Sequence, residues 1–392
     1  MRTKITVLTA TRAEYGLLSP IIHELLIRDC FEVKVVVTGA HLSPEFGLTY
    51  KEIEADGVEI DKKIEILLSS DTPASISKSM GLAMISFAEY FEESQPDILM
   101  VLGDRYETLA VCCVAMNARI PIVHLYGGET TEGAIDEAVR HAITKMSYFH
   151  FASTEEYRKR IIQLGEEPSR VYTVGAIGIE NALKMQLLSK EELEESIQFK
   201  LDRPFAVVTF HPTTLEDGQA QKQFQEILLA IEENSDMKYI FTKANADANG
   251  RVINKMIDEY VSQNENVVAF ESLGVKRYLS ALKFATLVIG NSSSGLLEVP
   301  SFKIPTINIG DRQKGRLKAN SVIDCMPTKQ SVRDAIKKAL SKEFLSMVQN
   351  VQNPYGDGNT SRKLVDIIER EIKSNGINLK KRFYDVPFKV EK

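Results

Sequence analysis

The stretch PDILMVLGDRYETLAVCCVAMNARIPIVHLYGG, residues 96–128, decides the fold class. It holds two short apolar runs, DILMVLG (97–103) and PIVHL (121–125), on either side of a longer segment with helical periodicity. A strand, a helix and a second strand in this order form a βαβ unit, whose two strands are parallel. Asp104 and Arg105 follow the first run directly, at the end of a strand where ligands of such sheets bind.

The same alternation runs through the whole chain in two series. The first series comprises KITVLT (4–9), EVKVVVT (32–38), the two runs above and FHFAS (149–153). The second series comprises FAVVTFHP (205–212), YIFTK (239–243), NVVAF (266–270), TLVIGN (286–291) and PTINIG (305–310). Two such series predict an α/β protein with two Rossmann-like domains, which we expect to face each other across a cleft.

A polar, charge-rich segment separates the two series. KMQLLSKEELEESIQFKLDRP (184–204) has helical character and ends at a proline directly before a new strand. We therefore expect an N-terminal Rossmann-like domain over residues 1–190, with most of the acid/base residues, and a C-terminal one over residues 191–365. Residues 366–392 are expected to form a C-terminal helix and tail that pack back on the N-terminal domain.

The composition indicates a soluble, cytoplasmic protein. None of the 392 residues belongs to an apolar stretch long enough to cross a membrane, and the N-terminus lacks the pattern of a signal peptide. The four cysteines show no CxxC spacing, so they are expected to be reduced thiols rather than metal ligands. A net charge of −6 argues against binding to nucleic acid. We expect neither a metal nor a cofactor.

Charged residues follow the runs of the first series. TRAEYG (11–16) stands where a dinucleotide enzyme would carry GxGxxG, and neither that motif nor a P-loop occurs in the chain. Arg12 is either a ligand for a phosphate or carboxylate or a solvated loop residue. The adjacent Asp104 and Arg105 are either placed for a ligand, or Asp104 is the N-cap of the next helix.

The motif HLYGGE (124–129) closes another strand, and the segment after it has helical spacing. Asp136 and Arg140 are four residues apart and share one helix face, as do Glu137 and His141. Taken alone, these are surface ion pairs of little energetic weight. Because a strand end and a pair of glycines precede the helix, one of its faces could instead border the cleft.

The second series is followed by residues suited to an anion. NSSSG (291–295) precedes LLEV, and hydroxyls with free backbone N–H groups at a helix start are typical of an anion site. Glu298 in that helix either accepts ribose hydroxyls or complements the helix dipole. Arg312 belongs to a basic run that supplies countercharge or is a solvated loop. Three further polar residues follow strands of this series, namely His211, Asn245 and Asp247.

Seven motifs in order cover residues from about 4 to about 385. They are TATRAEYG, GDRYE, GGETTEGAIDEAVRHAITKMS, FHP, NADANGR, GNSSSGLLEVPSFKIPTINIGDRQKGR and NPYGDGN. This ordered set resembles the hydrolysing UDP-N-acetylglucosamine 2-epimerases of sialic acid biosynthesis. The resemblance implies a GT-B-like fold with UDP bound by the C-terminal domain. It also implies a reaction that eliminates UDP to leave a 2-acetamidoglucal and hydrates this to N-acetylmannosamine.

The resemblance further implies roles for individual residues. The catalytic residues are Asp104, Asp136, Glu129, Arg140 and His211. The substrate-binding residues are Arg12, His41, Glu45, Arg105, Tyr126, Asn245, Asp247, Ser292, Ser293, Glu298 and Arg312. At the position of Tyr126 the human-type enzymes carry glutamate, and bacterial members often carry histidine. A tyrosine is no carboxylate base at neutral pH, so Glu129 or another acid takes that role and Tyr126 is expected to line the sugar pocket.

Three alternatives stay open. The same reaction on UDP-2,4-diacetamido-2,4,6-trideoxyglucose, on the route to legionaminic-type acids, differs only at C4 and C6 of the sugar. A GT-B glycosyltransferase would use the same nucleotide-sugar cleft, and a noncatalytic sensor of nucleotide sugars would not need Asp104 and Asp136. The resemblance also implies a homo-oligomer, either a dimer or a tetramer.

Overall fold

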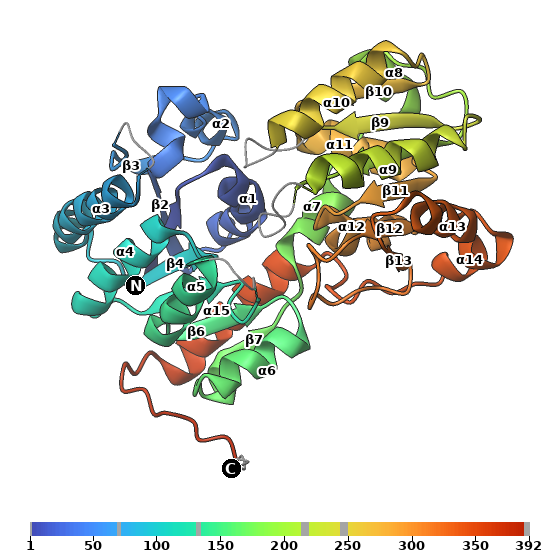
Figure 1. The fold of residues 1–392 in the computed structure, drawn as a ribbon. Coiled ribbons are helices and arrows are strands. Elements are labelled where there is room, and N and C mark those ends of the chain that lie inside the picture. The colour runs from blue at the N-terminus through green and yellow to red at the C-terminus, as the bar shows by residue number, and fades with distance from the viewer. Residues whose placement is uncertain (1, 69–71, 131–134, 213–218, 244–249, 388–392) are drawn as a thin grey trace. The chain divides into compact units, whose positions relative to one another are not determined.

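The chain forms two compact units, each built on its own parallel sheet (Figure 1). The computed structural model describes residues 2–68, 72–130, 135–212, 219–243 and 250–387. Unit 1 comprises Met1–Asn181 and Tyr355–Lys392, and unit 2 comprises Ala182–Pro354. The prediction of an α/β protein with two Rossmann-like domains is confirmed.

Unit 1 holds a parallel sheet with the order β3-β2-β1-β4-β5-β6-β7 within the described ranges. Its strands are β1 (Thr3–Thr9), β2 (Phe31–Thr38), β3 (Ile60–Ile64), β4 (Ile98–Leu102), β5 (Ile122–Leu125), β6 (Phe149–Ala152) and β7 (Val171–Thr173). The sheet grows in one direction from β1 and in the other from β4, so its topological switch point lies between these two strands. In such sheets ligands bind at the carboxyl ends beside the switch point.

Helices cover both faces of this sheet. They are α1 (Arg12–Leu26), α2 (Tyr50–Ala55), α3 (Pro73–Ser94), α4 (Tyr106–Asn117), α5 (Ile135–Met146), α6 (Glu155–Gln163), α7 (Ile177–Lys184) and α15 (Thr360–Asn375). On one face, Leu18 of α1 and Leu364 of α15 enter the buried apolar cluster. On the other face, Phe87, Val111 and Ile143 enter from α3, α4 and α5. Because both faces are covered, β4 is buried along its whole length.

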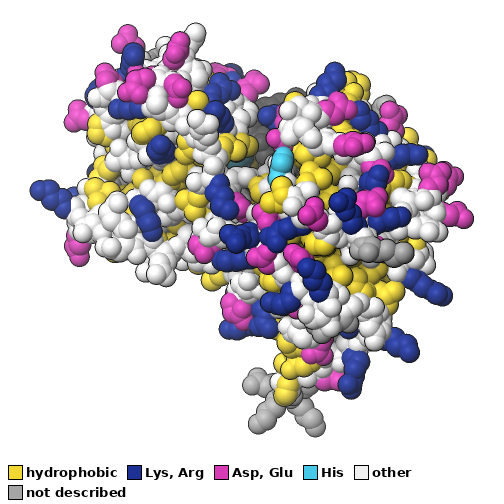
Figure 2. Space-filling view, turned by 180° about the vertical axis from the view of Figure 1, so that it is seen from behind, with side chains coloured by type: hydrophobic (Ala, Val, Ile, Leu, Met, Phe, Trp, Pro, Cys, Tyr) yellow, Lys and Arg dark blue, Asp and Glu magenta, His cyan; other side chains and the backbone are white. Residues whose placement is uncertain are grey.

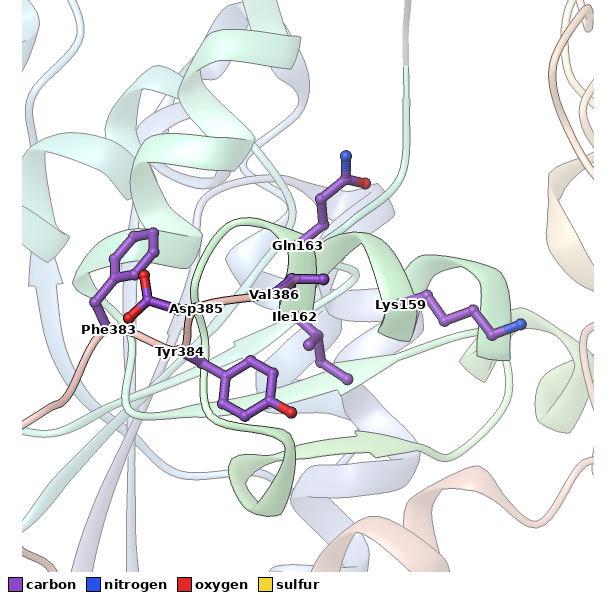
Figure 3. A pocket seen from close by; sticks show the side chains of 7 residues that line it. All are labelled: Lys159, Ile162, Gln163, Phe383, Tyr384, Asp385 and Val386. Carbon is purple, nitrogen blue, oxygen red and sulfur yellow. The ribbon is translucent and has the colours of Figure 1, made fainter. Parts of the chain in front are cut away.

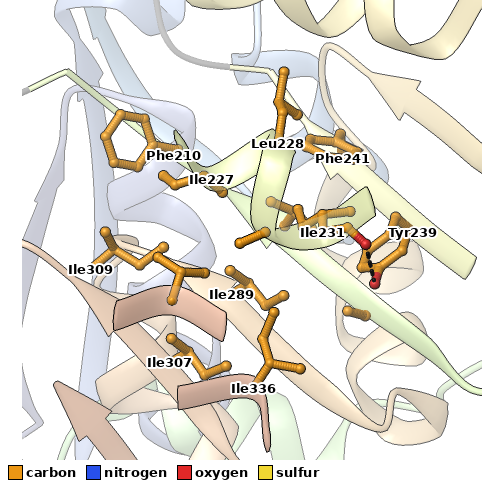
Figure 4. Packing of buried hydrophobic residues seen from close by; sticks show 14 of the residues in the cluster. Phe210, Ile227, Leu228, Ile231, Tyr239, Phe241, Ile289, Ile307, Ile309 and Ile336 are labelled. Carbon is orange, nitrogen blue, oxygen red and sulfur yellow. Dashed lines mark hydrogen bonds between the residues drawn. The ribbon is translucent and has the colours of Figure 1, made fainter. Parts of the chain in front are cut away.

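Unit 2 repeats the plan with the strand order β10-β9-β8-β11-β12-β13. Its strands are β8 (Phe205–Thr209), β9 (Lys238–Thr242), β10 (Val267–Phe270), β11 (Leu287–Gly290), β12 (Thr306–Ile309) and β13 (Val322–Cys325). Its helices are α8 (Lys190–Ile197), α9 (Ala220–Glu232), α10 (Gly250–Ser262), α11 (Gly274–Phe284), α12 (Ser294–Leu297), α13 (Lys329–Ala339) and α14 (Lys342–Val348). In Figure 4, Ile227 and Ile231 of α9 lie over Ile289 and Ile307 of the sheet.

The boundaries of the units differ from the expected ones. Ala182, Leu187 and Leu193 pack in one apolar cluster of unit 2, so the chain changes unit before residue 190. It re-enters unit 1 at Tyr355, and all of α15 belongs there, rather than only the residues from 366 onward.

The last helix is held against the first one. In unit 1, α15 packs on α1, and Arg28 just beyond α1 binds two carboxylates of α15. Its guanidinium lies 2.7 Å from Asp366 and 3.2 Å from Glu369. The helices α1 and α15 come from nearly opposite ends of the sequence, and their apolar side chains pack in one cluster of unit 1.

Acidic and basic side chains are interspersed on the face drawn in Figure 2. Within the described ranges, no helix is long and apolar enough to cross a membrane.

Candidate active site

A cavity of about 840 Å³ opens in unit 1 where β1, β2 and β4 end. Three of the expected substrate-binding residues line it, namely Arg12, Glu45 and Arg105. Arg12 is largely exposed, and its Nε lies 3.0 Å from a carboxylate oxygen of Glu52. The cavity lining thus includes two guanidinium groups, each paired with a carboxylate, and guanidinium groups are suited to bind an anionic ligand.

One carboxyl at the cavity holds Arg105 in place, and a second lies close enough to interact with its charge. The Glu107 side chain is fully buried and accepts two hydrogen bonds from the Arg105 guanidinium, at 2.7 and 3.2 Å. Glu14 accepts hydrogen bonds from the backbone N–H groups of Ala10 and Thr11, at 2.7 and 3.1 Å. Burial raises the pKa of Glu14 to about 7. The loops after β1 and β4 therefore meet in a compact charged cluster.

His41 lies beside this cluster and is completely buried. One ring nitrogen is 2.9 Å from the Thr9 hydroxyl and the other is 2.9 Å from the Thr49 hydroxyl. Burial lowers the pKa of His41 to about 4, so the ring is neutral at pH 7. His41 therefore supports Thr49, which itself lines the cavity, and its role in substrate binding stays a prediction.

Asp104 forms an ion pair with Arg140 of α5. The helix α4 begins at Tyr106 with Arg105 as its N-cap residue, so the alternative that Asp104 caps this helix is wrong. Arg140 also binds a carboxylate oxygen of Glu137 at 3.2 Å, and its side chain is nearly buried. The Arg140 guanidinium thereby links the loop after β4 to α5, and it binds one carboxylate from each.

Asp136 lies close enough to this pair to feel its charges. Burial, together with the nearby carboxylate of Asp104, raises the pKa of Asp136. On the same helix the expected pair of Glu137 and His141 is present at 3.1 Å. The structure therefore brings Asp104, Asp136 and Arg140 together, from segments more than thirty residues apart in the sequence.

Glu129 and Tyr126 follow β5 at the same end of the sheet. The Glu129 carbonyl accepts a hydrogen bond from Arg140 at 2.8 Å, and its carboxylate accepts one from Ser153 at 3.1 Å. Tyr126 has a left-handed backbone with φ of 64°. Its hydroxyl accepts a hydrogen bond from the N–H of Ile177 at 2.8 Å, at the start of α7. Tyr126 thus braces α7, and its contact with a sugar stays a prediction.

In unit 2, His211 at the end of β8 is joined to Asn291 at the end of β11. The backbone N–H of His211 donates to the Asn291 side chain, and the amide of that side chain donates to the His211 carbonyl, both at 2.8 Å. The carbonyl of Asn291 accepts hydrogen bonds from Arg312 at 3.0 Å and Gln313 at 2.9 Å. Three loops are therefore tied together beside the switch point of this sheet.

The serine run begins a helix that is shorter than expected. The helix α12 spans four residues, and the cap residue Ser293 makes no side-chain capping bond. Beyond it, burial of its carboxyl raises the pKa of Glu298. The Tyr278 hydroxyl, the Ser294 hydroxyl and one Glu298 oxygen are buried in one polar cluster, and within the described residues none of these three atoms makes a hydrogen bond of good geometry. Such atoms suit the hydroxyl groups of a ligand.

Two of the expected binding residues, Asn245 and Asp247, lie outside the described residues.

Another cavity, of about 590 Å³, lies between α6 and the C-terminal tail (Figure 3). Lys159, Ile162 and Gln163 line it from α6, and Tyr384 and Asp385 line it from the tail. This cavity is lined by none of the candidate catalytic or substrate-binding residues, whereas three of the latter line the cavity at the ends of β1, β2 and β4.

Sequence reasoning overlooked several buried polar residues that support the site. Glu14 and Glu107 stand inside the motifs TRAEYG and GDRYE, but an amphipathic helix pattern cannot show that they are buried. Tyr278 and Gln313 lie outside every quoted strand end. The sequence marks a site residue only where a charged residue follows a buried strand directly. This pattern identified Arg12 and Arg105, but it did not identify the buried carboxyls of Glu14 and Glu107.

The sequence profile of the UDP-N-acetylglucosamine 2-epimerase family matches residues 23–369. A GDP/UDP-N,N'-diacetylbacillosamine 2-epimerase (hydrolyzing) of Campylobacter jejuni is 46% identical over 88% of this chain and 89% of its own length. The polysialic acid biosynthesis protein P7 of Escherichia coli is 40% identical over 98% of both chains. The crystal structure of UDP-GlcNAc 2-epimerase from Neisseria meningitidis bound to UDP-GlcNAc has the same fold, with a TM-score of 0.75 at 20% identity over 94% of this chain and all of that chain.

The two parallel-sheet domains place the chain in the GT-B-like fold class. Within this class, the chain belongs to the UDP-N-acetylglucosamine 2-epimerase family, and it is a UDP-sugar 2-epimerase of the hydrolysing type.

Proposed function

We propose that this enzyme removes UDP from UDP-N-acetylglucosamine and releases N-acetylmannosamine for sialic acid biosynthesis. The observation that best supports this proposal is the pair of acids beside Arg140, in which Asp104 is ion-paired and Asp136 has a raised pKa. An ion-paired carboxylate beside a carboxyl with a raised pKa suits a reaction that removes one proton and later adds another. The name of the E. coli relative, a polysialic acid biosynthesis protein, supports the sialic acid route.

The first half of the proposed reaction is an elimination. The proton on C2 is not acidic, because no carbonyl is attached to that carbon, so cleavage of the C1–O bond runs ahead and builds positive charge at C1. Asp104 takes the C2 proton as UDP departs with the C1–O electron pair, and the C2–H electrons form the C1=C2 bond. Carboxylates near C1 stabilise the developing positive charge.

The second half adds water across this double bond. Asp136 donates its proton to C2 from the opposite face, which gives the manno configuration. The water oxygen bonds to C1, the proton of that water restores Asp136, and Asp104 releases the C2 proton to solvent. The raised pKa of Asp136 favours the protonated form that this step needs.

The nucleotide is proposed to bind to unit 2. The hydroxyls of Ser292 and Ser293 and the side chains of His211 and Arg312 would contact the diphosphate, and Glu298 would accept ribose hydroxyls. One buried oxygen of Glu298 makes no hydrogen bond of good geometry within the described residues, which supports this assignment because a ribose hydroxyl would satisfy it.

A second candidate substrate is UDP-N,N'-diacetylbacillosamine, the 2,4-diacetamido-2,4,6-trideoxy sugar. The relative that is 46% identical is named for this compound, which is the specific observation in its favour. The chemistry at C1 and C2 is the same for both sugars, so the acids described above serve either one.

Incubation of the protein with each UDP-sugar in D₂O, followed by NMR, tests the proposal. We expect UDP and free N-acetylmannosamine with deuterium at C2, and comparison of kcat/KM for the two sugars decides between the substrates. Release of the diacetamido product at a much higher kcat/KM would assign the second substrate. A UDP-linked 2-epimer as the product, or no turnover of either sugar, would refute the hydrolysing reaction. Assembly into a dimer or tetramer and location in the cytoplasm stay predictions from the sequence.

A further inference from the structure

A buried histidine outside the proposed reaction, His124 of β5, lies behind the acidic pair. Its side chain has no solvent exposure. Its Nε2 is 2.8 Å from the Gly103 carbonyl, and its Nδ1 is 3.3 Å from the Thr144 hydroxyl. Gly127 packs so close that a Cβ there would lie 3.1 Å from both Nδ1 and the Thr144 hydroxyl. The ring is therefore held on several sides.

The partners of the ring determine its protonation. A carbonyl only accepts hydrogen bonds, so Nε2 must carry the hydrogen that it shares with Gly103. Burial lowers the pKa of His124 to about 3, so the ring is neutral and Nδ1 is an acceptor. The single hydroxyl hydrogen of Thr144 is consequently shared between Nδ1 and the Arg140 carbonyl, which lies 3.0 Å from the Thr144 oxygen.

These contacts close a ring of interactions that includes the ion pair of Asp104 and Arg140. Gly103, with φ of 77°, directly precedes Asp104, and Thr144 lies one helical turn beyond Arg140. Asp104 and Arg140 are themselves ion-paired. His124 thus joins the backbone that carries the acid to the helix that carries its guanidinium partner.

We propose that His124 is a positioning residue that fixes Asp104 and Arg140 relative to each other through its Nε2–H tautomer. It acts through Gly103 and Thr144 and does not touch the substrate. This inference rests on the proposed function, in which Asp104 takes the C2 proton. Displacement of a reacting group by about 1 Å can cost about a hundredfold in rate, so the effect of losing this brace should fall on kcat.

Two variants separate the hydrogen bond from the packing. In His124→Gln the amide N–H can reach the Gly103 carbonyl, whereas in His124→Asn the shorter side chain places its amide near Nδ1 and loses that bond. We expect His124→Asn to lower kcat about 30-fold with little change in KM, and His124→Gln to stay within about fivefold of wild type. Equal losses in both variants, or no loss in His124→Asn, would overturn the proposal.

A matched control is available on the neighbouring strand. His150 of β6 is the register partner of His124 and is equally buried, but its ring binds Glu166 at 3.1 Å. We expect His150→Asn to lower the unfolding temperature without the selective loss of kcat. If it lowered kcat as His124→Asn does, a merely structural role would explain both.

The tautomer is measured without a substrate. In ¹⁵N-histidine spectra of the ligand-free protein, the signal that disappears in His124→Gln should show the neutral Nε2–H form from about pH 5 to pH 8. A protonated ring or an Nδ1–H tautomer would overturn the proposal. Failure of the wild type to turn over any UDP-sugar would instead refute the proposed function and leave this measurement intact.

Discussion

At the scale of single residues, one guanidinium distinguishes the two acids of the site. Arg140 binds the Asp104 carboxylate directly, whereas burial and the charge of Asp104 raise the pKa of Asp136, which lies on the same helix as Arg140. A spacing of four residues favoured Asp136 as the partner of Arg140, because only local helix geometry is visible in a sequence. The tertiary contact brought in Asp104 from a strand end, which the rule for parallel sheets had also marked as a binding position.

Substitution of the proposed base tests this pattern. We expect Asp104→Asn to lower kcat by about 10³ or more, because the amide can still accept a hydrogen bond from Arg140 but cannot take the C2 proton. Release of UDP from UDP-N-acetylglucosamine is the measurement. The exposed Asp29 gives the matched control, and Asp29→Asn should leave kcat unchanged. Near-normal turnover of Asp104→Asn would remove Asp104 from the mechanism.

Glu14 should make the stability of the protein depend on pH. Its folded pKa is raised by burial from 4.5 to about 7, so the folded state binds the proton more tightly than the unfolded state does. The stabilisation from this group is complete below pH 4.5 and is lost as the pH rises to about 7, by up to about 3 kcal/mol. We expect the free energy of unfolding, measured with urea between these pH values, to fall less steeply with rising pH in Glu14→Gln than in wild type. Identical slopes would contradict the assignment.

At the scale of elements, the central strands were predictable, but among the described strands only one of the four at a sheet edge was. All ten apolar runs in the sequence form strands, and one of them is the partly buried edge strand β10. The strands that the runs did not predict are β3, β7 and β13, and each lies at a sheet edge. Their sequences IDKKI, VYT and VIDC are short or carry charges, because an edge strand is only partly covered. These strands join the sheet through hydrogen bonds to a neighbouring strand, and no apolar pattern in the sequence indicates them.

The start of α15 depends on a carboxylate from another helix. Glu180 of α7 is nearly buried and accepts hydrogen bonds from the N–H of Ser361 at 2.7 Å and from its hydroxyl at 2.6 Å. The N-cap residue Asn359 makes no side-chain capping bond, so Glu180 satisfies a first-turn N–H that the helix itself leaves unpaired.

Removal of this acceptor should destabilise unit 1. We expect Glu180→Ala to cost about 2 kcal/mol, since a buried N–H and a buried hydroxyl lose their partner together. Chemical denaturation is the measurement, with Glu89→Ala on the exposed side of α3 as the control. A change no larger than that of the control would show that water replaces the carboxylate without cost.

At the scale of the whole molecule, the two units are proposed to divide the work. The acids and their supporting residues lie in unit 1, and the candidate nucleotide contacts lie mainly in unit 2. In both units, hydrogen bonds join the polar loops that follow the strand ends. Arg140 makes such a bond in unit 1, and Asn291 makes one in unit 2. The repeated strand rhythm of the sequence reveals this duplication, but it cannot reveal which loops are joined, because those bonds connect residues far apart in the chain.

This division predicts that a substitution in unit 2 weakens UDP binding, whereas a substitution in unit 1 removes turnover. Glu298→Ala should raise the Kd of UDP about tenfold, because the buried cluster with Tyr278 and Ser294 loses the proposed acceptor for ribose. Asp104→Asn should leave that Kd within about twofold while it removes turnover. Calorimetric titration of both variants with UDP alone measures binding without chemistry. Weakening of UDP binding by Asp104→Asn to the same degree as by Glu298→Ala would mean that the nucleotide contacts extend into unit 1, and the division of work would have to be abandoned.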